Sequence, residues 1–333
     1  MLKWSAWEGD APGWDALLLQ FPDHTFYQGY GWGAHKSYFG WRPHRLVAMD
    51  GNQTIAMAQV LVRRFPLGVS LAWVNGGPVG LPAAWGEPLR IAIRAVAGTY
   101  HLYCRINSMH EYSEKDSQVI RSVGWSAPTH CIVSGRSILL DLTSPEKEWL
   151  SAITGKHRYY VKKANGAPLE WACGNTGALR RDLVTLTQTL IVEKGMDLPE
   201  WDAQTVEDLN TNLGDAVFIL IGYLNARPVT GCLVLIQGAV AYYLSAATLK
   251  DGRDVSAAYS MFARVRGLLR ERGIQVLDFG GINPASEKAR GVDHFKRGFG
   301  GKEIRYLGES DWATSSVLRR AANYLIKRRT PGM

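Results

Sequence analysis

One succession of predicted elements, a β-hairpin followed by a strand, a helix and a further strand, occurs twice in this 333-residue chain. The first copy begins with a hairpin around the turn Asp50-Gly51-Asn52, and the second with a hairpin around residues 225–228, roughly half a chain later. Glycine and asparagine accept the positive φ of such tight turns. The repeat favours an α+β protein of two domains, each with a mixed sheet, an antiparallel hairpin and one crossover helix.

The segment between the two copies predicts the domain boundary. Ser144-Pro145-Glu146 has the capping residue, the early proline and the acid that are typical of a helix start, and it follows the last strand of the first copy. We therefore expect a first domain over residues 1–143 and a second over residues 144–309. Residues 310–333 predict a basic amphipathic helix that packs back on the first domain.

The composition is that of a folded protein. Hydrophobic residues make up 46% of the chain and charged residues 20%, which excludes disorder as the main state. The longest apolar runs are far shorter than the roughly 18 residues of a membrane span, and no apolar signal core follows the N-terminus, so we expect a cytoplasmic protein. The four cysteines form no CxxC pair and predict buried, reduced thiols rather than a metal site or disulfides.

The charge of the chain indicates an anionic partner without identifying it. Lys and Arg number 38 against 30 Asp and Glu, so the formal net charge is 38 − 30 = +8. A nucleotide, a phosphorylated metabolite, RNA or simply a basic surface would each agree with this excess. The densest cluster includes Arg158, Lys162 and Lys163, which a helix would place on adjacent faces. These residues predict either contact with tRNA phosphates or a solvated helix, and the basic C-terminal segment has the same two interpretations.

Several common catalytic motifs are absent from the sequence. We find no G-x-S-x-G elbow, no H-E-x-x-H, no Walker A sequence and no G-x-G-x-x-G that opens a helix after a strand. The usual hydrolase, metalloprotease and nucleoside-triphosphate chemistries are therefore not indicated. What remains is a glycine-rich segment, residues 278–308, in which Asp278 and Lys296 stand near the end of a predicted strand.

This glycine-rich segment resembles the Fem family of aminoacyltransferases, which belongs to the GNAT superfamily of N-acetyltransferases. The matching residues are 278–281 (DFGG), 291–301 (GVDHFKRGFGG) and 306–308, together with 26–41 (FYQGYGWGAHKSYFGW) and 77–79 (GPV). The resemblance implies two GNAT-like domains. It also implies transfer of an amino acid from aminoacyl-tRNA to the amine of a UDP-muramyl peptide, a lipid-linked precursor or a small acceptor.

The reaction implied by the resemblance agrees with the missing nucleophile motif. An aminoacyl ester is already activated, so an amine can attack it directly once the two substrates are aligned and the oxyanion is stabilised. Aminoacyl-tRNA is then a co-substrate, and no cofactor is expected. The family pattern places the catalytic lysine at Lys296, for which a solvated helix lysine is the alternative. Residues 178–213 have room for only two ordinary helices, so we expect the coiled-coil arm of some relatives to be absent. We also expect a monomer.

Other substrate-binding residues follow from the same resemblance. Lys36 matches a position associated with a nucleotide-sugar acceptor, and Phe295 stands beside Lys296 in the family motif. Lys194 corresponds to a position that is usually arginine, and a lysine cannot form the bidentate contact to phosphate. Tyr242 and Tyr243 alternate across one predicted strand, and we assign Tyr243 to the site.

Arg105 and Asn107 lie on one predicted strand, where relatives have an aspartate that has been proposed as a base. Because Asn107 cannot accept a proton, three possibilities remain: no base is needed, His110 or Glu111 replaces it, or the acceptor differs. Arg105 is either a substrate-binding residue or half of a structural ion pair.

Two other classes of function compete with aminoacyl transfer. An acyl-CoA-dependent N-acyltransferase of the same fold would bind pyrophosphate in a loop at a helix N-terminus, here residues 253–258. Ser256 replaces the glycine of that loop, and Asp251 and Asp254 add negative charge beside it, which weakens this reading. The third class is a non-catalytic protein that binds RNA or another ligand.

Overall fold

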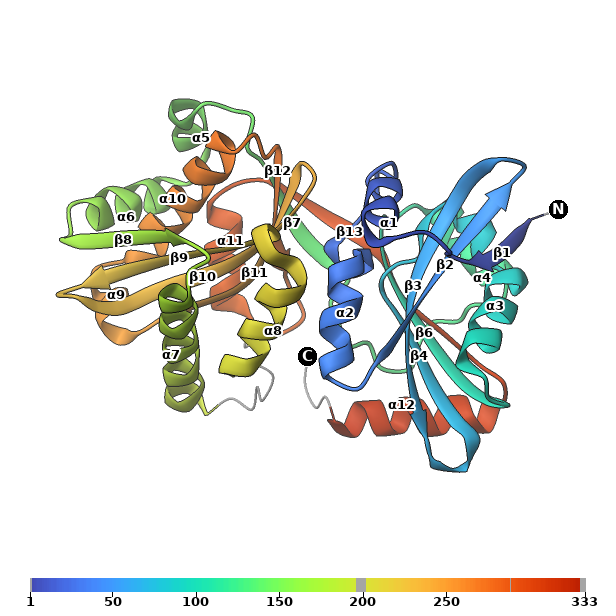
Figure 1. The fold of residues 1–333 in the computed structure, drawn as a ribbon. Coiled ribbons are helices and arrows are strands. Elements are labelled where there is room, and N and C mark those ends of the chain that lie inside the picture. Colours follow the sequence, from blue (N-terminus) through green and yellow to red (C-terminus); the bar gives the residue numbers. More distant parts are fainter. Residues whose placement is uncertain (1, 196–201, 288, 330–333) are drawn as a thin grey trace. The chain divides into compact units, whose positions relative to one another are not determined.

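The computed structural model describes residues 2–195, 202–287 and 289–329, and the chain divides into two compact units (Figure 1). Unit 1 comprises residues 1–136 and 304–333, and unit 2 comprises residues 137–303. The chain enters unit 2 earlier than the predicted boundary at 143/144, because β7 (Arg136–Asp141) pairs with β12 of the second sheet. It returns at 303/304 rather than 309/310, because β13 (Lys302–Ala313) pairs with β6 of the first sheet.

The sheet of unit 1 contains the first predicted hairpin and crossover. β4 and β6 are parallel, the other neighbours are antiparallel, and Gly51 adopts φ +57° in the turn, as predicted. In spatial order the strands are β1 (Lys3–Ala6), β2 (Arg42–Asp50), β3 (Gln53–Phe65), β4 (Val69–Gly76), β6 (His101–Glu111) and β13, with β5 (Val79–Gly80) also paired to β3.

Helices cover both faces of this sheet. Successive β2 residues point to opposite faces, so that Leu46 packs with α3 and α4 and Val47 packs with α1. Helix α1 begins after the capping residue Asp10, whose side chain accepts a 2.9 Å hydrogen bond from the Gly13 amide. The helices are α1 (Ala11–Leu18), α2 (Tyr30–Tyr38), α3 (Glu87–Ala97), α4 (Glu114–Ser122) and α12 (Ser316–Arg329), with short 3₁₀ turns at Phe26–Gln28, Pro66–Gly68 and Pro82–Trp85.

The predicted helix over residues 310–333 is wrong at its start. Trp312 pairs with Cys104, so residues up to Ala313 continue β13, and α12 begins only at Ser316. The helix belongs to unit 1, where Asn323 is buried against the sheet. Residues 330–333 lie outside the described part of the chain.

Unit 2 repeats the same order of elements. β11 and β12 are parallel and joined through α10, and the other neighbouring strands are antiparallel. In spatial order the strands are β7, β12 (Val276–Gly281), β11 (Val240–Thr248), β10 (Arg227–Gln237), β9 (Val217–Leu224) and β8 (Leu169–Gly174). The helices are α5 (Glu146–Ala152), α6 (Gly155–Asn165), α7 (Gly177–Lys194), α8 (Ala203–Leu213), α9 (Lys250–Asp254), α10 (Ala257–Glu271) and α11 (Arg290–Gly298), with a 3₁₀ turn at Gly214–Ala216.

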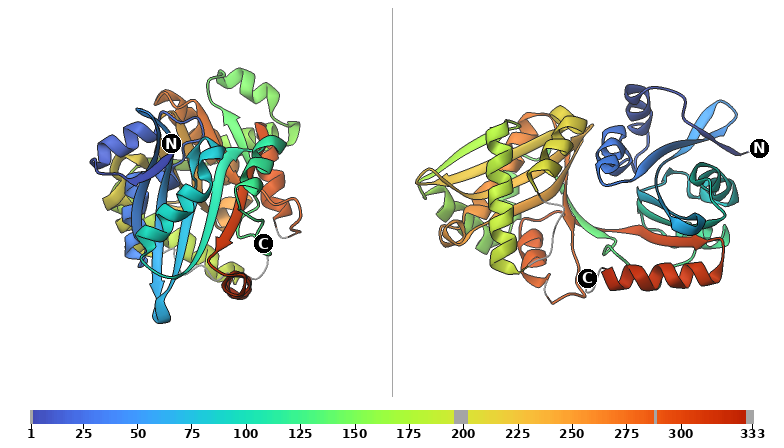
Figure 2. Two further views of the ribbon diagram at one scale, coloured as in Figure 1. Left: turned by 90° about the vertical axis from the view of Figure 1, so that its right-hand side faces the viewer. Right: turned by 60° about the horizontal axis from the view of Figure 1, so that its bottom comes forward.

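The core of unit 2 lies between its sheet and α10, which contributes Phe262, Val265 and Leu269. Figures 1 and 2 show α7 and α8 on the face of the sheet opposite α10. They are two ordinary helices, and no coiled-coil arm occurs in residues 2–195, 202–287 and 289–329. The predicted fold class, two sheets of the same order flanked by helices, is confirmed.

The prediction about the four cysteines is correct for only two of them. Cys104 and Cys232 are buried as free thiols, but Cys131 and Cys173 are exposed, so the prediction of four buried cysteines is wrong for half of them. Across the described ranges, no helix combines the length and the apolar character needed to cross a membrane. The same residues contain no group of three metal-ligating side chains.

Candidate functional site

The end of β12 in unit 2 is shaped by Asp278. Its buried carboxylate accepts hydrogen bonds from the Ser137 hydroxyl and, at 2.8 Å, from the Gly280 amide. Gly280 has φ +79°, in the left-handed region that favours glycine. A Cβ at this position would lie 3.4 Å from Lys296 Nζ and 3.3 Å from the Tyr243 carbonyl oxygen. The Asp278 carboxylate therefore holds the end of the strand through the Gly280 amide, and Gly280 leaves space for the Lys296 ammonium.

Lys296 projects from α11 onto this strand end. Its ammonium group donates a 2.7 Å hydrogen bond to the Gly281 carbonyl and lies 5.9 Å from the centre of the Phe279 ring. Burial lowers the pKa of Lys296, and the carboxylates of Asp278 and Asp293 partly oppose that effect. Lys296 is therefore a half-buried amine at the end of β12, and it is more easily deprotonated than a surface lysine.

Two further predicted site residues share this location. The Tyr243 ring lies 5.1 Å from the Phe279 ring, and the Phe295 ring lies 6.0 Å from it. Burial raises the pKa of the Tyr243 hydroxyl well above its ordinary value, so this group is a neutral hydrogen-bonding group rather than a base. Lys296, Phe295 and Tyr243 thus form one group around Phe279, which we call the Lys296 cluster.

A histidine that the sequence did not single out for this role holds α11 in place. His157 on α6 is buried; Thr154 Oγ1 lies 2.8 Å from its Nδ1, and the Phe295 carbonyl lies 3.0 Å from its Nε2. Burial lowers the pKa of His157, which favours the neutral ring with Nε2 donating to Phe295. Gly298 makes the contact possible, because a Cβ there would lie 1.8 Å from the ring. The sequence does not show this role, because it depends on the contact between α6 and α11, which lie far apart in the chain.

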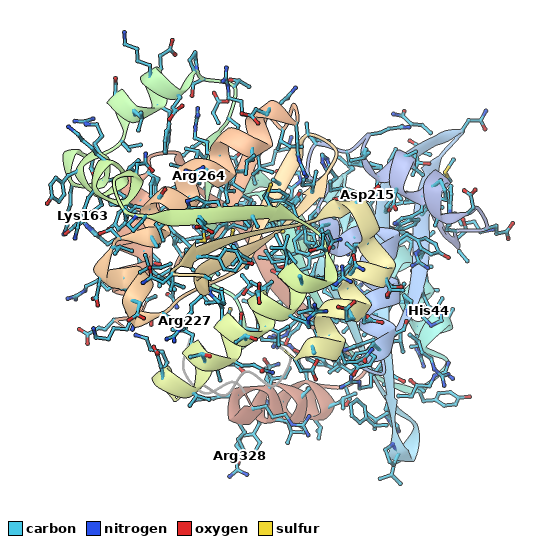
Figure 3. The ribbon with its side chains drawn as sticks, turned by 60° about the vertical axis from the view of Figure 1, so that its left-hand side comes forward. His44, Lys163, Asp215, Arg227, Arg264 and Arg328 are labelled. Atoms are coloured by element: carbon cyan, nitrogen blue, oxygen red, sulfur yellow. The ribbon has the colours of Figure 1, made fainter. Side chains whose placement is uncertain are left out.

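The basic cluster predicted on α6 does not act as one surface. The Arg158 guanidinium donates to the carbonyls of Leu150, Ser151 and Ile153 at 2.8–3.1 Å, so it closes the C-terminus of α5. Lys162 and Lys163 are exposed, and Figure 3 labels Lys163 on α6. The Lys163 ammonium donates at 3.3 Å to the Asp254 carbonyl.

These two lysines line a groove of about 540 Å³ just before α10. Ser256, the N-cap of α10, has φ +60° and ψ +30°. The loop therefore takes a left-handed conformation at the position where a glycine was expected.

In unit 1, Lys36 lies on α2, within the family-like segment of residues 26–41. Its ammonium group is 4.8 Å from the Trp32 ring centre and 4.7 Å from that of Phe39. Gln28 fixes this motif to the sheet: its side chain donates at 2.7 Å to the Asn75 carbonyl and accepts at 2.6 Å from the Gln59 amide. The family-like sequence is thus a buried brace for α2, with Lys36 half-buried near its end.

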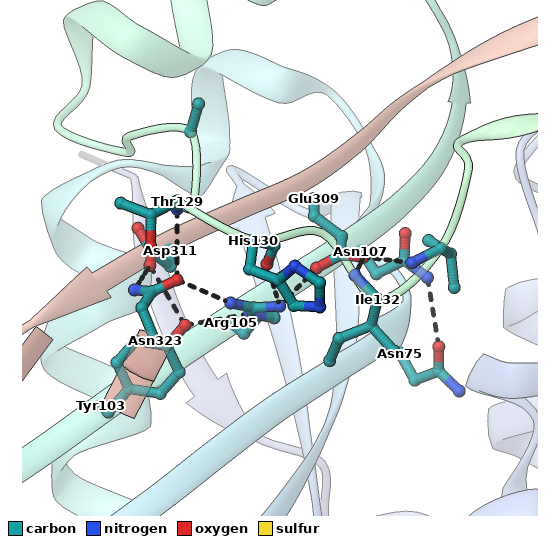
Figure 4. Close-up of polar contacts among 12 residues, drawn as sticks. Asn75, Tyr103, Arg105, Asn107, Thr129, His130, Ile132, Glu309, Asp311 and Asn323 are labelled. Carbon is teal, nitrogen blue, oxygen red and sulfur yellow. Dashed lines mark hydrogen bonds and ion pairs between the residues drawn. The ribbon is translucent and has the colours of Figure 1, made fainter. Parts of the chain in front are cut away.

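Asn107 lies near the end of β6 and donates at 3.4 Å to the Asn75 side chain (Figure 4). His110, three residues later, lies between two acids: its Nδ1 is 3.1 Å from Asp23 and its Nε2 is 3.4 Å from Asp116. These contacts raise the pKa of His110, most strongly through the hydrogen bond to Asp23. An imidazolium stabilised in this way is a poor proton acceptor, which disfavours the hypothesis that His110 replaces the missing base.

The assignment of Arg105 to substrate binding is corrected by its surroundings. The guanidinium is buried in unit 1, 2.6 Å from the Glu309 carboxylate, and it also donates to Tyr103, the His130 carbonyl and Asn323 (Figure 4). These contacts engage four of the five N–H donors of the side chain inside the protein. Arg105 is therefore the structural ion pair that was the alternative.

Lys194 is the exposed last residue of α7, where its charge favours the helix C-terminus. Among the described residues, it makes no hydrogen bond or ion pair with the Lys296 cluster. Its proposed role in acceptor binding stays a prediction, and residues 196–201 beside it lie outside the described part of the chain.

The fold of the chain is that of two GNAT-like domains in tandem. The chain aligns with a tandem GNAT protein from the clavulanic acid biosynthesis pathway at a TM-score of 0.56 and 9% identity, over 95% of this chain and 99% of that one. It aligns with the crystal structure of FemX at a TM-score of 0.81 and 16% identity, over 97% of this chain and 100% of that one.

Sequence comparison matches part of the chain to a family. The FemAB family model matches residues 202–327, which include the whole Lys296 cluster. A Lipid II:glycine glycyltransferase of Staphylococcus haemolyticus (strain JCSC1435) is 29% identical over 119 residues, a match that spans 35% of this chain and 28% of that enzyme. Residues 202–327 thus match the FemAB family, and the fold of the chain is similar to that of FemX.

Proposed function

We propose that this protein is an aminoacyltransferase that moves an amino acid from aminoacyl-tRNA to an amine of a peptidoglycan precursor. The observation that carries the proposal is the Lys296 ammonium, held 2.7 Å from the Gly281 carbonyl at the end of β12. That lysine lies in the segment matched by the FemAB family model, and the relative named for glycyl transfer to Lipid II supports the same type of reaction.

The proposed reaction needs no enzyme nucleophile and no cofactor. A neutral acceptor amine attacks the ester carbonyl of the aminoacyl donor, so a C–N bond forms while the ester C–O bond breaks. The amine loses a proton, and the departing ribose oxygen gains one, which leaves an amide and uncharged tRNA. Lys296 donates a hydrogen bond to the oxygen that carries the developing negative charge. Its lowered pKa makes it able to pass a proton as well.

The acceptor is proposed at the level of its chemistry. The candidates are a UDP-linked muramyl peptide, its lipid-linked form and a small amine. Lys36, beside two aromatic rings, would contact a phosphate of the first two. Asn107 provides an amide hydrogen bond but no base, which is consistent with an amine that arrives neutral.

One observation favours a second candidate, an acyl-CoA-dependent N-acyltransferase. Ser256 has the left-handed conformation of a glycine at the start of α10, so the loop that opens this helix keeps its shape without that glycine. Asp254 still places a carboxylate within the loop, paired with Lys250 at 2.8 Å. We place this reading second because that carboxylate would repel a pyrophosphate.

The decisive experiment measures transfer of a radiolabelled amino acid from a mixture of charged tRNAs to muramyl-peptide acceptors. Lys296→Ala should lower turnover at least about a hundredfold, the scale of losing one oxyanion donor. Lys147→Ala, at an exposed lysine of α5, is the matched control and should leave turnover unchanged. Near-normal turnover in Lys296→Ala would remove the lysine from the mechanism, and tight acetyl-CoA binding without any effect on charged tRNA would favour the second candidate.

A further inference from the structure

One end of unit 1 exposes apolar side chains to an unusual degree. Leu67, at the tip of the β3–β4 turn, has 94% of its surface exposed and a left-handed backbone conformation with φ +63°. Tyr100 is 82% exposed, and Val317 on α12 is 74% exposed. Leucine in the left-handed region costs roughly 1–2 kcal/mol relative to glycine, so folding in water alone gives no reason for a leucine at this tip.

The sheet brings these three residues to the same end of unit 1. β4 and β6 are parallel and start together, with Val69 paired to His101, so the turn that holds Leu67 lies beside Tyr100. β13 runs in the opposite direction and finishes there: the Thr314 amide donates at 3.0 Å to the Leu102 carbonyl. Helix α12 begins two residues later, and Figures 1 and 2 show it at the same end as the β3–β4 turn.

Helix α12 adds cations to this apolar end. Its inner side packs on unit 1 through Asn323 and through Arg319, which is paired with Asp311 at 2.7 Å. On its outer side the exposed apolar residues Val317, Tyr324 and Leu325 stand next to exposed cations. Those cations are Arg320, Lys327, Arg328 and Arg329, and residues 316–329 contain no acidic residue.

We propose that this end of unit 1 docks on an anionic lipid bilayer. The docking surface consists of Leu67, Tyr100, Val317 and Leu325 as the apolar part and Arg320, Lys327 and Arg328 as the cationic part. A basic amphipathic helix lies in the plane of a membrane interface with its apolar residues among the acyl chains and its cations on anionic headgroups. Arg328, which Figure 3 shows at the end of α12, reaches over the Tyr324 ring at 5.0 Å and extends the cationic edge.

The apolar residues favour a bilayer over the other partners of a basic surface. RNA offers phosphates to the arginines but no apolar environment for Leu67, Val317 and Leu325. A second copy of this chain would oppose one cationic surface to another, which is repulsive. A bilayer with anionic lipids satisfies both halves of the surface together. The inference concerns binding alone and holds whichever acyl donor the enzyme uses.

The test is co-sedimentation of the full chain with vesicles of phosphatidylcholine and phosphatidylglycerol, compared with vesicles of phosphatidylcholine alone. The apolar variant carries Leu67→Asn, Val317→Gln and Leu325→Gln; asparagine tolerates the left-handed region, so the turn keeps its shape. The cationic variant carries Arg320→Gln, Lys327→Gln and Arg328→Gln. The control variant carries Ile91→Gln and Arg94→Gln, at exposed positions of α3 in the same unit.

We expect salt-sensitive binding to the vesicles that contain phosphatidylglycerol, weakened at least about tenfold in the apolar and in the cationic variant and unchanged in the control. Failure of the unmodified chain to bind these vesicles, or wild-type binding by the apolar variant, would overturn the proposal. The proposal would also be overturned if the cationic variant bound tRNA more weakly but bound the vesicles as well as the unmodified chain does. Transfer to a water-soluble acceptor should stay at the wild-type level in all variants, which separates this inference from the proposed function.

Discussion

The Arg105 guanidinium lies 2.6 Å from the Glu309 carboxylate, and the two side chains retain only 3% and 2% of their exposure. Glu309 also accepts hydrogen bonds from the amides of Ile132 and Val133, so the ion pair joins β6 and β13 to the loop before β7. Burial raises the pKa of Glu309, and Arg105 opposes that rise. Arg105 thus provides the positive charge that compensates the buried carboxylate of Glu309.

Replacing Arg105 by alanine should therefore destabilise the protein strongly. We expect the free energy of unfolding to fall by about 3–5 kcal/mol, because an unpaired charge remains buried. Urea denaturation followed by circular dichroism measures this change. The matched control is Arg121→Ala, which breaks an exposed pair with Glu114 at 3.6 Å and should cost less than about 1 kcal/mol. Equal losses in the two variants would show that the Arg105–Glu309 pair contributes no more than a surface contact.

Gly298→Ala tests the contact between α6 and α11. Its Cβ would lie 1.8 Å from the His157 ring, so the helices must separate, at a cost of about 1–3 kcal/mol or more. Because Lys296 lies on α11, we also expect kcat to fall while the affinity for acceptor changes little. Gly291→Ala is the control in the same helix: nothing lies within 4 Å of its Cβ, and alanine should stabilise α11 by up to about 1 kcal/mol. Unfolding curves and turnover of both variants decide the matter, and equal behaviour would contradict tight packing of His157.

The repeated hairpin and crossover could be predicted from the sequence because the signals are local. The turn at Asp50-Gly51-Asn52 depends on residues a few positions apart. The domain boundary and the start of α12 could not be predicted in the same way. They depend on β7 and β13 pairing with strands far away in the chain, and no local pattern of residues records such pairing.

The same difference between local sequence signals and contacts between distant segments applies to the candidate site. The family resemblance indicated Lys296 and Phe295, and the alternation of side chains along a strand indicated Tyr243. The fold brings the three residues together around Phe279. The roles of Arg105 and Arg158 could not be predicted, because a cation in a sequence looks the same whether it binds a substrate or a buried carbonyl. Only the position of Glu309, and of the last turn of α5, shows the difference.

His110 should make the stability of unit 1 depend on pH. Its folded pKa is raised by Asp23 and Asp116, so the stabilisation is complete below the unfolded pKa of about 6.5 and is lost as pH rises through the folded value. His110→Gln should therefore lower the free energy of unfolding by about 1 kcal/mol at pH 5.5 and by less at pH 8.5. Thermal or urea unfolding at both pH values measures the difference. Equal losses at the two pH values in His110→Gln would contradict the ion pair.

The left-handed conformation of Ser256 leads to a test of the loop at the start of α10. A residue with a Cβ costs roughly 1–2 kcal/mol in this region relative to glycine, so Ser256→Gly should unfold at higher urea concentration than Ser256→Ala by about that difference. At Ser260, inside α10, the order should be reversed, because glycine is about 1 kcal/mol less favourable than alanine in a helix interior. The same order of stability at both positions would contradict the left-handed backbone. Calorimetry of Ser256→Gly with acetyl-CoA tests the identity of the acyl donor. If aminoacyl-tRNA is the donor, this variant should not bind acetyl-CoA tightly, because the Asp254 carboxylate remains in the loop and repels the pyrophosphate.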